Sequence, residues 1–140
     1  MNIGGLQISF GTEIQDLVSL NIYLSGCKNN KQCLRSQCHN PDLKDFEYGS
    51  SFREAFPEIE YFLQNNLIDA VCLLGGEPLD NSLENLKELI LFIKSRNKIP
   101  VYMYSGYEDE IFLKDSLQQL DIDGIFFGAY SPVANKKFMK

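Results

Sequence analysis

The spacing of hydrophobic and polar residues predicts strands that alternate with helices. Apolar and polar residues alternate over 18–24, a pattern typical of a half-buried strand. Short apolar runs over 70–74 and 99–104 predict two further strands, and residues 124–128 predict the last one. No repeat or linker interrupts this order, so these strands and helices are expected to belong to one domain.

Between these strands, apolar residues three or four positions apart predict helices. The first helix is expected over 57–66, the second from Asn81 and Glu84 to about residue 94, and the third over 108–120. In the first helix Ile59, Phe62 and Leu63 share one face, and in the second the helical spacing is kept by Leu83, Leu86, Ile90 and Ile93. In the third helix Ile111, Phe112 and Leu117 are expected to point inward. The alternation favours an α/β fold with a mostly parallel sheet and right-handed crossovers.

Three of the predicted strands end in loops of unusual composition. The strand over 18–24 ends at Ser25-Gly26-Cys27, the next at Gly75-Gly76-Glu77-Pro78, and the third at Ser105-Gly106-Tyr107. Parallel strands place their carboxyl ends at one edge of a sheet, where α/β proteins carry their active sites. We therefore expect the three loops to lie on one rim.

The first of these loops concentrates the cysteines. Cys27, Cys33 and Cys38 fall within twelve residues, whereas Cys72 stands alone in an apolar run. The segment from residue 28 to 51 has no clear period, which predicts a long functional loop.

The composition of the chain indicates the cellular environment of these thiols. The chain has 140 residues, 44% of them hydrophobic, which predicts a single domain over residues 1–140. Its net charge is −6. It has neither a basic stripe for nucleic acid nor an apolar stretch for a membrane. A soluble, cytoplasmic protein is expected, in which thiols stay reduced and clustered cysteines indicate metal or redox chemistry rather than disulfides.

Two metal chemistries fit the cysteine loop. A structural zinc site needs four ligands, and His39, directly after Cys38, is an awkward fourth. Three thiolates suit a [4Fe–4S] cluster with one iron open to a small molecule, although such clusters commonly take four protein thiolates. Cys72 is expected to be a buried apolar residue and not a ligand.

Together the motifs resemble those of a known family. Ser25-Gly26-Cys27, Cys38-His39-Asn40, Gly75-Gly76-Glu77-Pro78 and Tyr104-Ser105-Gly106-Tyr107 follow the order found in radical S-adenosylmethionine (SAM) enzymes. The chain is most similar to the activating enzymes of anaerobic ribonucleotide reductase, including the aspartate-bearing last strand over 122–128. Its cysteine pattern is C-x5-C-x4-C, where the family usually has C-x3-C-x2-C.

This resemblance implies a shortened, open β/α barrel, a [4Fe–4S] cluster and SAM as cofactors. It assigns the cluster to Cys27, Cys33 and Cys38 and names no catalytic side chain beyond the cluster and the SAM site. The residues that it places around SAM are His39, Asn40, Gly75, Gly76, Glu77, Pro78, Ser105 and Gly106. For Gly75-Gly76-Glu77-Pro78 and for Ser105-Gly106, a simple turn is the alternative interpretation.

The resemblance also implies a reaction and partners. SAM would be cleaved to a 5′-deoxyadenosyl radical that creates a glycyl radical on anaerobic ribonucleotide reductase, with an electron donor such as a flavodoxin. The short chain offers little material for a substrate pocket, so a partner protein is expected to cover the rim. Two alternatives stay open: a small radical-SAM enzyme acting on a small molecule such as a 7-deazapurine precursor, and a non-catalytic zinc or iron–sulfur interaction module.

Overall fold

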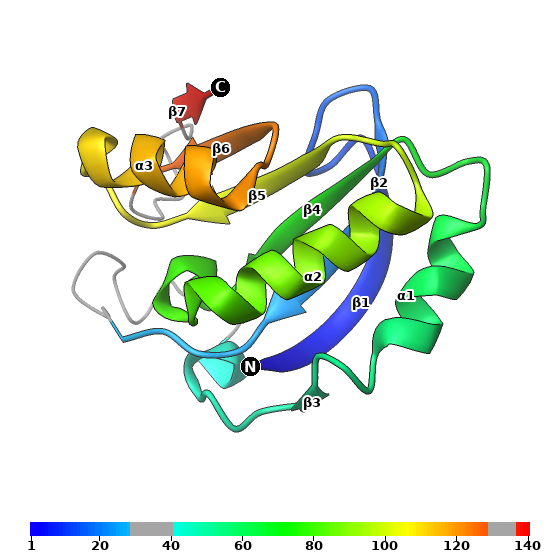
Figure 1. Cartoon of the computed structure of the whole chain (residues 1–140), viewed down its shortest axis with the longest axis horizontal. Helices are drawn as coiled ribbons and strands as arrows, with labels where there is room; N and C mark the ends of the chain where they lie inside the picture. Colours follow the sequence, from blue (N-terminus) through cyan, green and yellow to red (C-terminus); the bar gives the residue numbers. More distant parts are fainter. Residues whose placement is uncertain (29–40, 129–136) are drawn as a thin grey trace.

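A single mixed sheet organises the protein. The computed structural model describes residues 1–28, 41–128 and 137–140, and within these residues seven strands form one sheet in the order β3-β1-β2-β4-β5-β6-β7 (Figure 1). The central strands β2, β4, β5 and β6 are parallel, and the outer strands pair antiparallel. The strands are β1 (Asn2–Phe10), β2 (Val18–Leu24), β3 (Ser50–Ser51), β4 (Ala70–Gly75), β5 (Val101–Ser105), β6 (Gly124–Phe127) and β7 (Lys137–Met139). The α/β class and the parallel centre are confirmed, and the partial barrel stays a prediction.

The helices share one hydrophobic core with one face of this sheet. In the described part of the chain they are α1 (Phe56–Leu63), α2 (Leu83–Arg96) and α3 (Glu110–Leu120), with short 3-10 helices η2 (Pro41–Lys44) and η3 (Pro78–Asp80). Figure 1 shows α2 lying across the central strands, between α1 and α3. Over the same residues, no helix is both long enough and apolar enough to cross a membrane.

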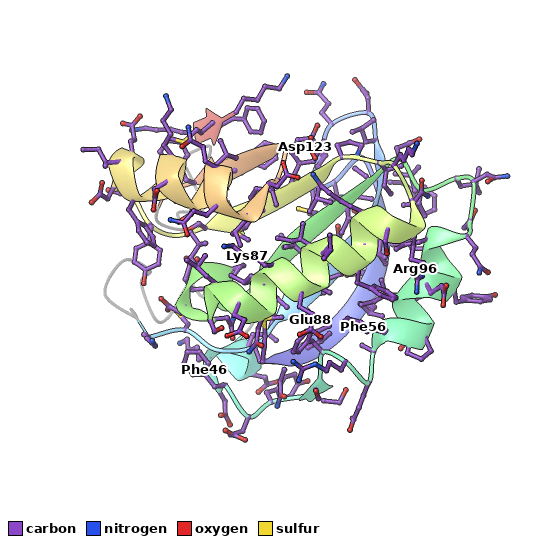
Figure 2. All side chains as sticks on the ribbon, viewed as in Figure 1. Phe46, Phe56, Lys87, Glu88, Arg96 and Asp123 are labelled. Carbon is purple, nitrogen blue, oxygen red and sulfur yellow. The ribbon has the colours of Figure 1, made fainter. Side chains whose placement is uncertain are left out.

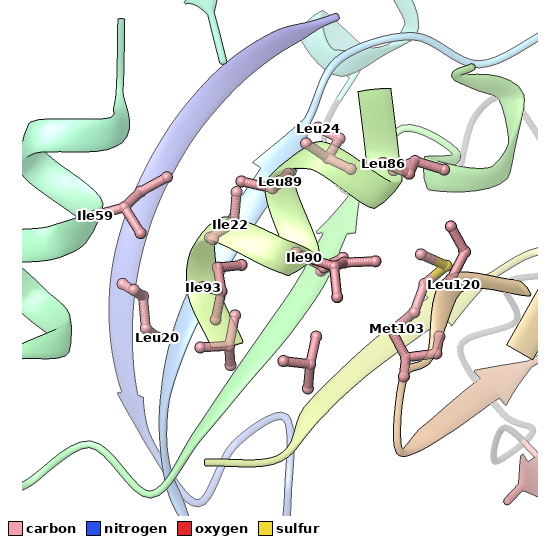
Figure 3. Packing of buried hydrophobic residues seen from close by; sticks show 14 of the residues in the cluster. Leu20, Ile22, Leu24, Ile59, Leu86, Leu89, Ile90, Ile93, Met103 and Leu120 are labelled. Atoms are coloured by element: carbon pink, nitrogen blue, oxygen red, sulfur yellow. The ribbon is translucent and has the colours of Figure 1, made fainter. Parts of the chain in front are cut away.

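The core forms where α2 packs on the parallel strands. Leu20, Ile22 and Leu24 point from β2 toward the helices because alternate side chains of a strand share one face (Figure 3). The α2 residues that meet them are Leu86, Leu89, Ile90 and Ile93, each at most 2% exposed. Burial of one such side chain contributes about 1.5–3 kcal/mol, so this contact fixes the sheet against the helices.

The opposite face of β2 is buried as well, which corrects the prediction of a half-buried strand. Ser19 and Asn21 are fully buried and form a closed set of hydrogen bonds with Ser9 of β1. Asn21 Nδ2 donates to Ser9 Oγ at 3.1 Å, and Ser19 Oγ donates to Asn21 Oδ1 at 2.8 Å. The polar residues of this strand therefore make their hydrogen bonds inside the protein, and their polarity does not mean that they face solvent.

The sequence pattern missed three outer strands and one helix cap. β1 pairs along most of β2, β3 pairs with β1, and β7 follows the strand that was expected to be last. Ser82, not Asn81, caps α2, because its Oγ accepts a hydrogen bond from Asn85 N at 3.2 Å.

The predicted inner face of the third helix is wrong at two of three positions. Ile111 is 85% exposed and Phe112 is 40% exposed, whereas Leu113, Leu117 and Leu120 are buried. Asp109 caps α3 by accepting from the backbone N–H groups of Ile111 and Phe112, so the helix starts later than expected. The buried leucines keep the four- and seven-residue spacing of one helical face, and Ile111 precedes that face.

This corrected face predicts a contrast between two substitutions in α3. Leu113→Ala should lower the free energy of unfolding by about 2–5 kcal/mol because it leaves a cavity in the core. Ile111→Ala, at an exposed position, should change it by no more than about 0.5 kcal/mol. Urea denaturation of both variants measures the difference, and equal losses would show that the helix is rotated relative to this description.

Candidate functional site

The three strand-end loops meet at one rim, as the sequence predicts. Leu24 at the end of β2 pairs in register with Gly75 at the end of β4. Beyond the strands, Gly76 N donates to Leu24 O at 3.0 Å and Glu77 N donates to Gly26 O at 2.7 Å. The loop that follows β4 is therefore bonded to the start of the cysteine segment.

The carboxylate of Glu77 joins the second loop to the third. Glu77 is 4% exposed, and its Oε2 accepts hydrogen bonds from Ser105 Oγ at 2.9 Å and Leu79 N at 3.1 Å. Its Oε1 accepts from Gly106 N at 2.5 Å. Both carboxylate oxygens of Glu77, a residue that the resemblance places around SAM, thus accept hydrogen bonds from the protein itself.

The environment of Glu77 shifts the pKa of its carboxyl group. Burial raises the pKa of the Glu77 carboxyl from 4.5 to about 7, although the donors on Gly106, Leu79 and Ser105 lower it. The negative charge of Asp80 raises this pKa further. Near neutral pH the group that joins the two loops therefore changes its charge.

The two glycines before Glu77 are required by the backbone around them. Gly75 has a φ of +136°, and a Cβ added there would lie 2.0 Å from Leu24 O. A Cβ on Gly76 would lie 2.3 Å from Leu43 O and 2.4 Å from Gly26 O. Close packing of the rim loops accounts for both glycines, so any contact they make with a cofactor would come from their backbone groups.

Cys27 lies at this rim, three residues beyond the end of β2, and it is partly exposed. Its backbone N–H donates to Lys44 O at 3.2 Å, which ties it to η2. Cys33, Cys38, His39 and Asn40 lie outside the described residues. Within the described residues, no three His, Cys, Asp or Glu side chains are grouped to hold a metal.

Cys72 differs from Cys27 in its burial. It is fully buried in β4 beside Ile14 and Ala70, on the face of the sheet opposite the main core. Burial raises the pKa of its thiol, and the neighbouring charge of Glu13 raises it further. Metals bind the thiolate, so an accessible Cys27 fits a cluster ligand and Cys72 does not.

Two rim residues that the sequence analysis assigned no role bind each other. Asp80 at the end of η3 is 9% exposed, and its Oδ1 accepts a hydrogen bond from the hydroxyl of Tyr107. Asp80 Oδ2 accepts from Lys28 N at 2.6 Å. The position of Asp80, three residues after Glu77 in a loop expected at the rim, was the available signal.

Asp123, the acidic residue of the last predicted strand, lies elsewhere. Its Oδ2 accepts a hydrogen bond from Val101 N at 2.8 Å and lies 3.8 Å from Lys94 Nζ. Figure 2 shows Asp123 and Phe46, the residue beside Gly26, at opposite ends of the sheet. Asp123 therefore holds the amino ends of β5 and β6 together and takes no part in the rim.

Comparison with known families identifies the class of domain. A family model described as a 4Fe-4S single cluster domain matches residues 17–135. The chain belongs to this family, whose iron–sulfur domain is of a kind associated with radical-SAM proteins. A comparison with curated proteins gave no match.

The contrast between the two described cysteines predicts which substitution removes iron. Cys27→Ala should abolish the cluster, and Cys33→Ala and Cys38→Ala should do the same. Cys72→Ala should keep about four irons per chain after anaerobic reconstitution and cost about 1 kcal/mol of stability. Iron analysis and absorbance measure this, and a Cys72→Ala protein without iron beside a loaded Cys27→Ala protein would refute the assignment.

The raised pKa of Glu77 predicts a pH dependence of stability. The folded pKa of about 7 lies above the ordinary value of 4.5. Its stabilisation is therefore complete below about pH 4.5 and is lost as pH rises through about 7, with a slope of at most about 1.4 kcal/mol per pH unit.

Denaturation midpoints between pH 4.5 and 8 measure this effect. Glu77→Gln is the control, because it cannot ionise and presents an NH2 group to hydrogen-bond donors. It should be less stable than the wild type at low pH and should lack this part of the slope. Identical slopes in the two proteins would show that Glu77 does not titrate in this range.

Proposed function

We propose that this protein is a radical-SAM enzyme that generates a glycyl radical on a partner protein. Cys27, Cys33 and Cys38 hold the cluster, and the rim loops bind SAM through His39, Asn40, the Gly75–Pro78 segment, Ser105 and Gly106. The observation that carries the proposal is the position of Cys27. In a chain of the 4Fe-4S single cluster family, it shares one hydrogen-bonded rim with both glycine-containing loops.

A reduced cluster held by Cys27, Cys33 and Cys38 would supply the one electron needed to cleave SAM to methionine and a 5′-deoxyadenosyl radical. That radical would take a hydrogen atom from a glycine Cα of the partner, which would leave 5′-deoxyadenosine and a glycyl radical. The chain's own residues position SAM and keep water away, because a free radical would otherwise react with solvent. Glu77 serves this purpose by fixing the two SAM loops relative to each other.

Exposed apolar side chains beside the rim support a protein as the substrate. Ile111 and Phe112 stand at the start of α3, and the Phe112 ring lies edge-on to Tyr107 with their centroids 5.2 Å apart. Asp109 and Glu110 precede them on the surface. Neighbouring exposed apolar residues with a charged border mark protein contact sites. We assign this surface to anaerobic ribonucleotide reductase, and the electron to a flavodoxin-type donor.

A second candidate function rests on the sheet face opposite the main core. There the rings of Tyr102, Tyr104, Phe126 and Phe138 form one cluster, with neighbouring centroids 4.6–6.1 Å apart. All four are partly or largely exposed. Aromatic side chains of this kind can stack on a purine-like ring, which favours a small-molecule substrate such as a 7-deazapurine precursor as the alternative.

One experiment distinguishes the two candidates. Reduced, reconstituted protein is mixed anaerobically with SAM and the reductase, and the electron paramagnetic resonance spectrum is recorded. We expect SAM cleavage and a glycyl-radical doublet that disappears when the reductase glycine is changed to alanine. SAM cleavage without that doublet, together with turnover of the small molecule, would replace the first function with the second.

The exposed start of α3 provides a variant for the same assay. Ile111→Glu should reduce the yield of glycyl radical about tenfold or more while SAM cleavage without the partner stays unchanged, as loss of a buried apolar contact implies. Leu91→Glu is the matched control, because Leu91 is also exposed, at 71%, but lies within α2. Equal radical yields from both variants would remove α3 from the interface.

A further inference from the structure

We propose that Asp80 and Tyr107 form a clamp that positions Cys27 and so sets the geometry and reduction potential of the cluster. The inference rests on the part of the proposed function that places the cluster on Cys27, and it is independent of the substrate. Asp80 and Tyr107 are positioning residues, because they act through the peptide next to the ligand and not on the reacting atoms.

Asp80 connects the cysteine segment to the loop that follows β5. Its Oδ2 accepts from Lys28 N at 2.6 Å, one residue beyond Cys27, and its Oδ1 accepts from the Tyr107 hydroxyl. The side chain is nearly buried, which makes hydrogen bonds to its carboxylate stronger than they would be in water. The Asp80 carboxylate, after β4, thus binds both the cysteine segment after β2 and the tyrosine after β5, on the two neighbouring strands.

Tyr107 is itself held in place from several sides. Its N–H donates to Ser105 Oγ at 3.1 Å, its carbonyl accepts from Gly128 N at 3.2 Å, and its ring contacts Phe112. Burial, the hydrogen bond to Asp80 and nearby negative charges raise the pKa of the Tyr107 hydroxyl. The phenol therefore stays protonated at neutral pH and keeps donating to Asp80.

Three consecutive N–H groups, those of Gly26, Cys27 and Lys28, attach the cysteine segment to the rest of the protein, and the clamp supplies the only side-chain acceptor among the three. Gly26 N donates to Leu43 O at 2.7 Å and Cys27 N donates to Lys44 O at 3.2 Å, so two consecutive peptides are held by the backbone of η2. Lys28 N is held by Asp80 instead. The direction in which the chain leaves Cys27 consequently depends on one carboxylate, which substitution can change without altering the backbone contacts.

A negative carboxylate beside the ligand segment also acts on the cluster through its charge. Reduction adds a negative charge to the cluster, and a neighbouring anion opposes it. Removing the charge should therefore raise the reduction potential, whereas removing only the Tyr107 hydroxyl should disturb the geometry with the charge left in place. Two variants separate these effects.

The test uses the 140-residue chain reconstituted anaerobically, with four variants. Asp80→Asn removes the charge, and Tyr107→Phe removes the hydroxyl but keeps the ring against Phe112. Asp115→Asn is the charge control on α3, and Tyr23→Phe is the hydroxyl control, since the hydroxyl of Tyr23 on β2 donates to Gln7 Oε1 on the neighbouring strand β1. Potentiometric titration, the paramagnetic resonance of the reduced cluster and iron release to a chelator are measured for each.

We expect Asp80→Asn to raise the reduction potential and Tyr107→Phe to change the g-values of the reduced cluster. Both should release iron on the order of tenfold faster, as loss of a hydrogen bond to a charged group implies. The controls should match the wild type. If Asp80→Asn does not fold, Tyr107→Phe alone decides the question, because it keeps every packing contact of the ring.

The outcomes separate this inference from the proposed function. If Tyr107→Phe and Asp80→Asn match the controls while the wild type cleaves SAM and forms the glycyl radical, the clamp is refuted and the proposed function stands. If the variants change the cluster but the wild type does not cleave SAM, the clamp stands and the proposed function fails. A wild-type protein that takes up no iron would overturn both.

Discussion

The buried carboxylate of Glu77 is the contact on which the rim depends. It accepts hydrogen bonds from Leu79, Ser105 and Gly106, and its own peptide N–H donates to Gly26. The loops after β2, β4 and β5 are thereby held as one unit. Parallel strands bring these loops to the same edge of the sheet, and the hydrogen bonds of Glu77 fix the spacing between them.

The rest of the site follows from that bridge. The turn after Glu77 is η3, which carries Asp80 to the peptide beyond Cys27 and to the Tyr107 hydroxyl. Tyr107 in turn contacts Phe112 at the exposed start of α3. A continuous set of contacts thus leads from the first described cysteine of the family motif to the surface where we place the partner.

The sequence predicted the elements that repeat a simple pattern and missed those fixed by tertiary contacts. The apolar runs of β4 and β5 and the spacing in α2 identified the core, and the strand-end motifs identified the rim. The phase of α3 was wrong because Asp109, and not the apolar residues, sets where the helix begins. Glu77 was expected to face a ligand. Its protein partners on Ser105 and Gly106 lie 28 and 29 residues away along the chain, beyond the range of any local pattern.

The central claim is that SAM binds directly to a cluster held at this rim. The most direct measurement is the paramagnetic resonance of the reduced, reconstituted protein with SAM labelled with 15N in its amino group. We predict that SAM changes the cluster signal and that the 15N nucleus couples to the unpaired electron. An unchanged signal without nitrogen coupling, from a protein that holds its full complement of iron, would contradict it.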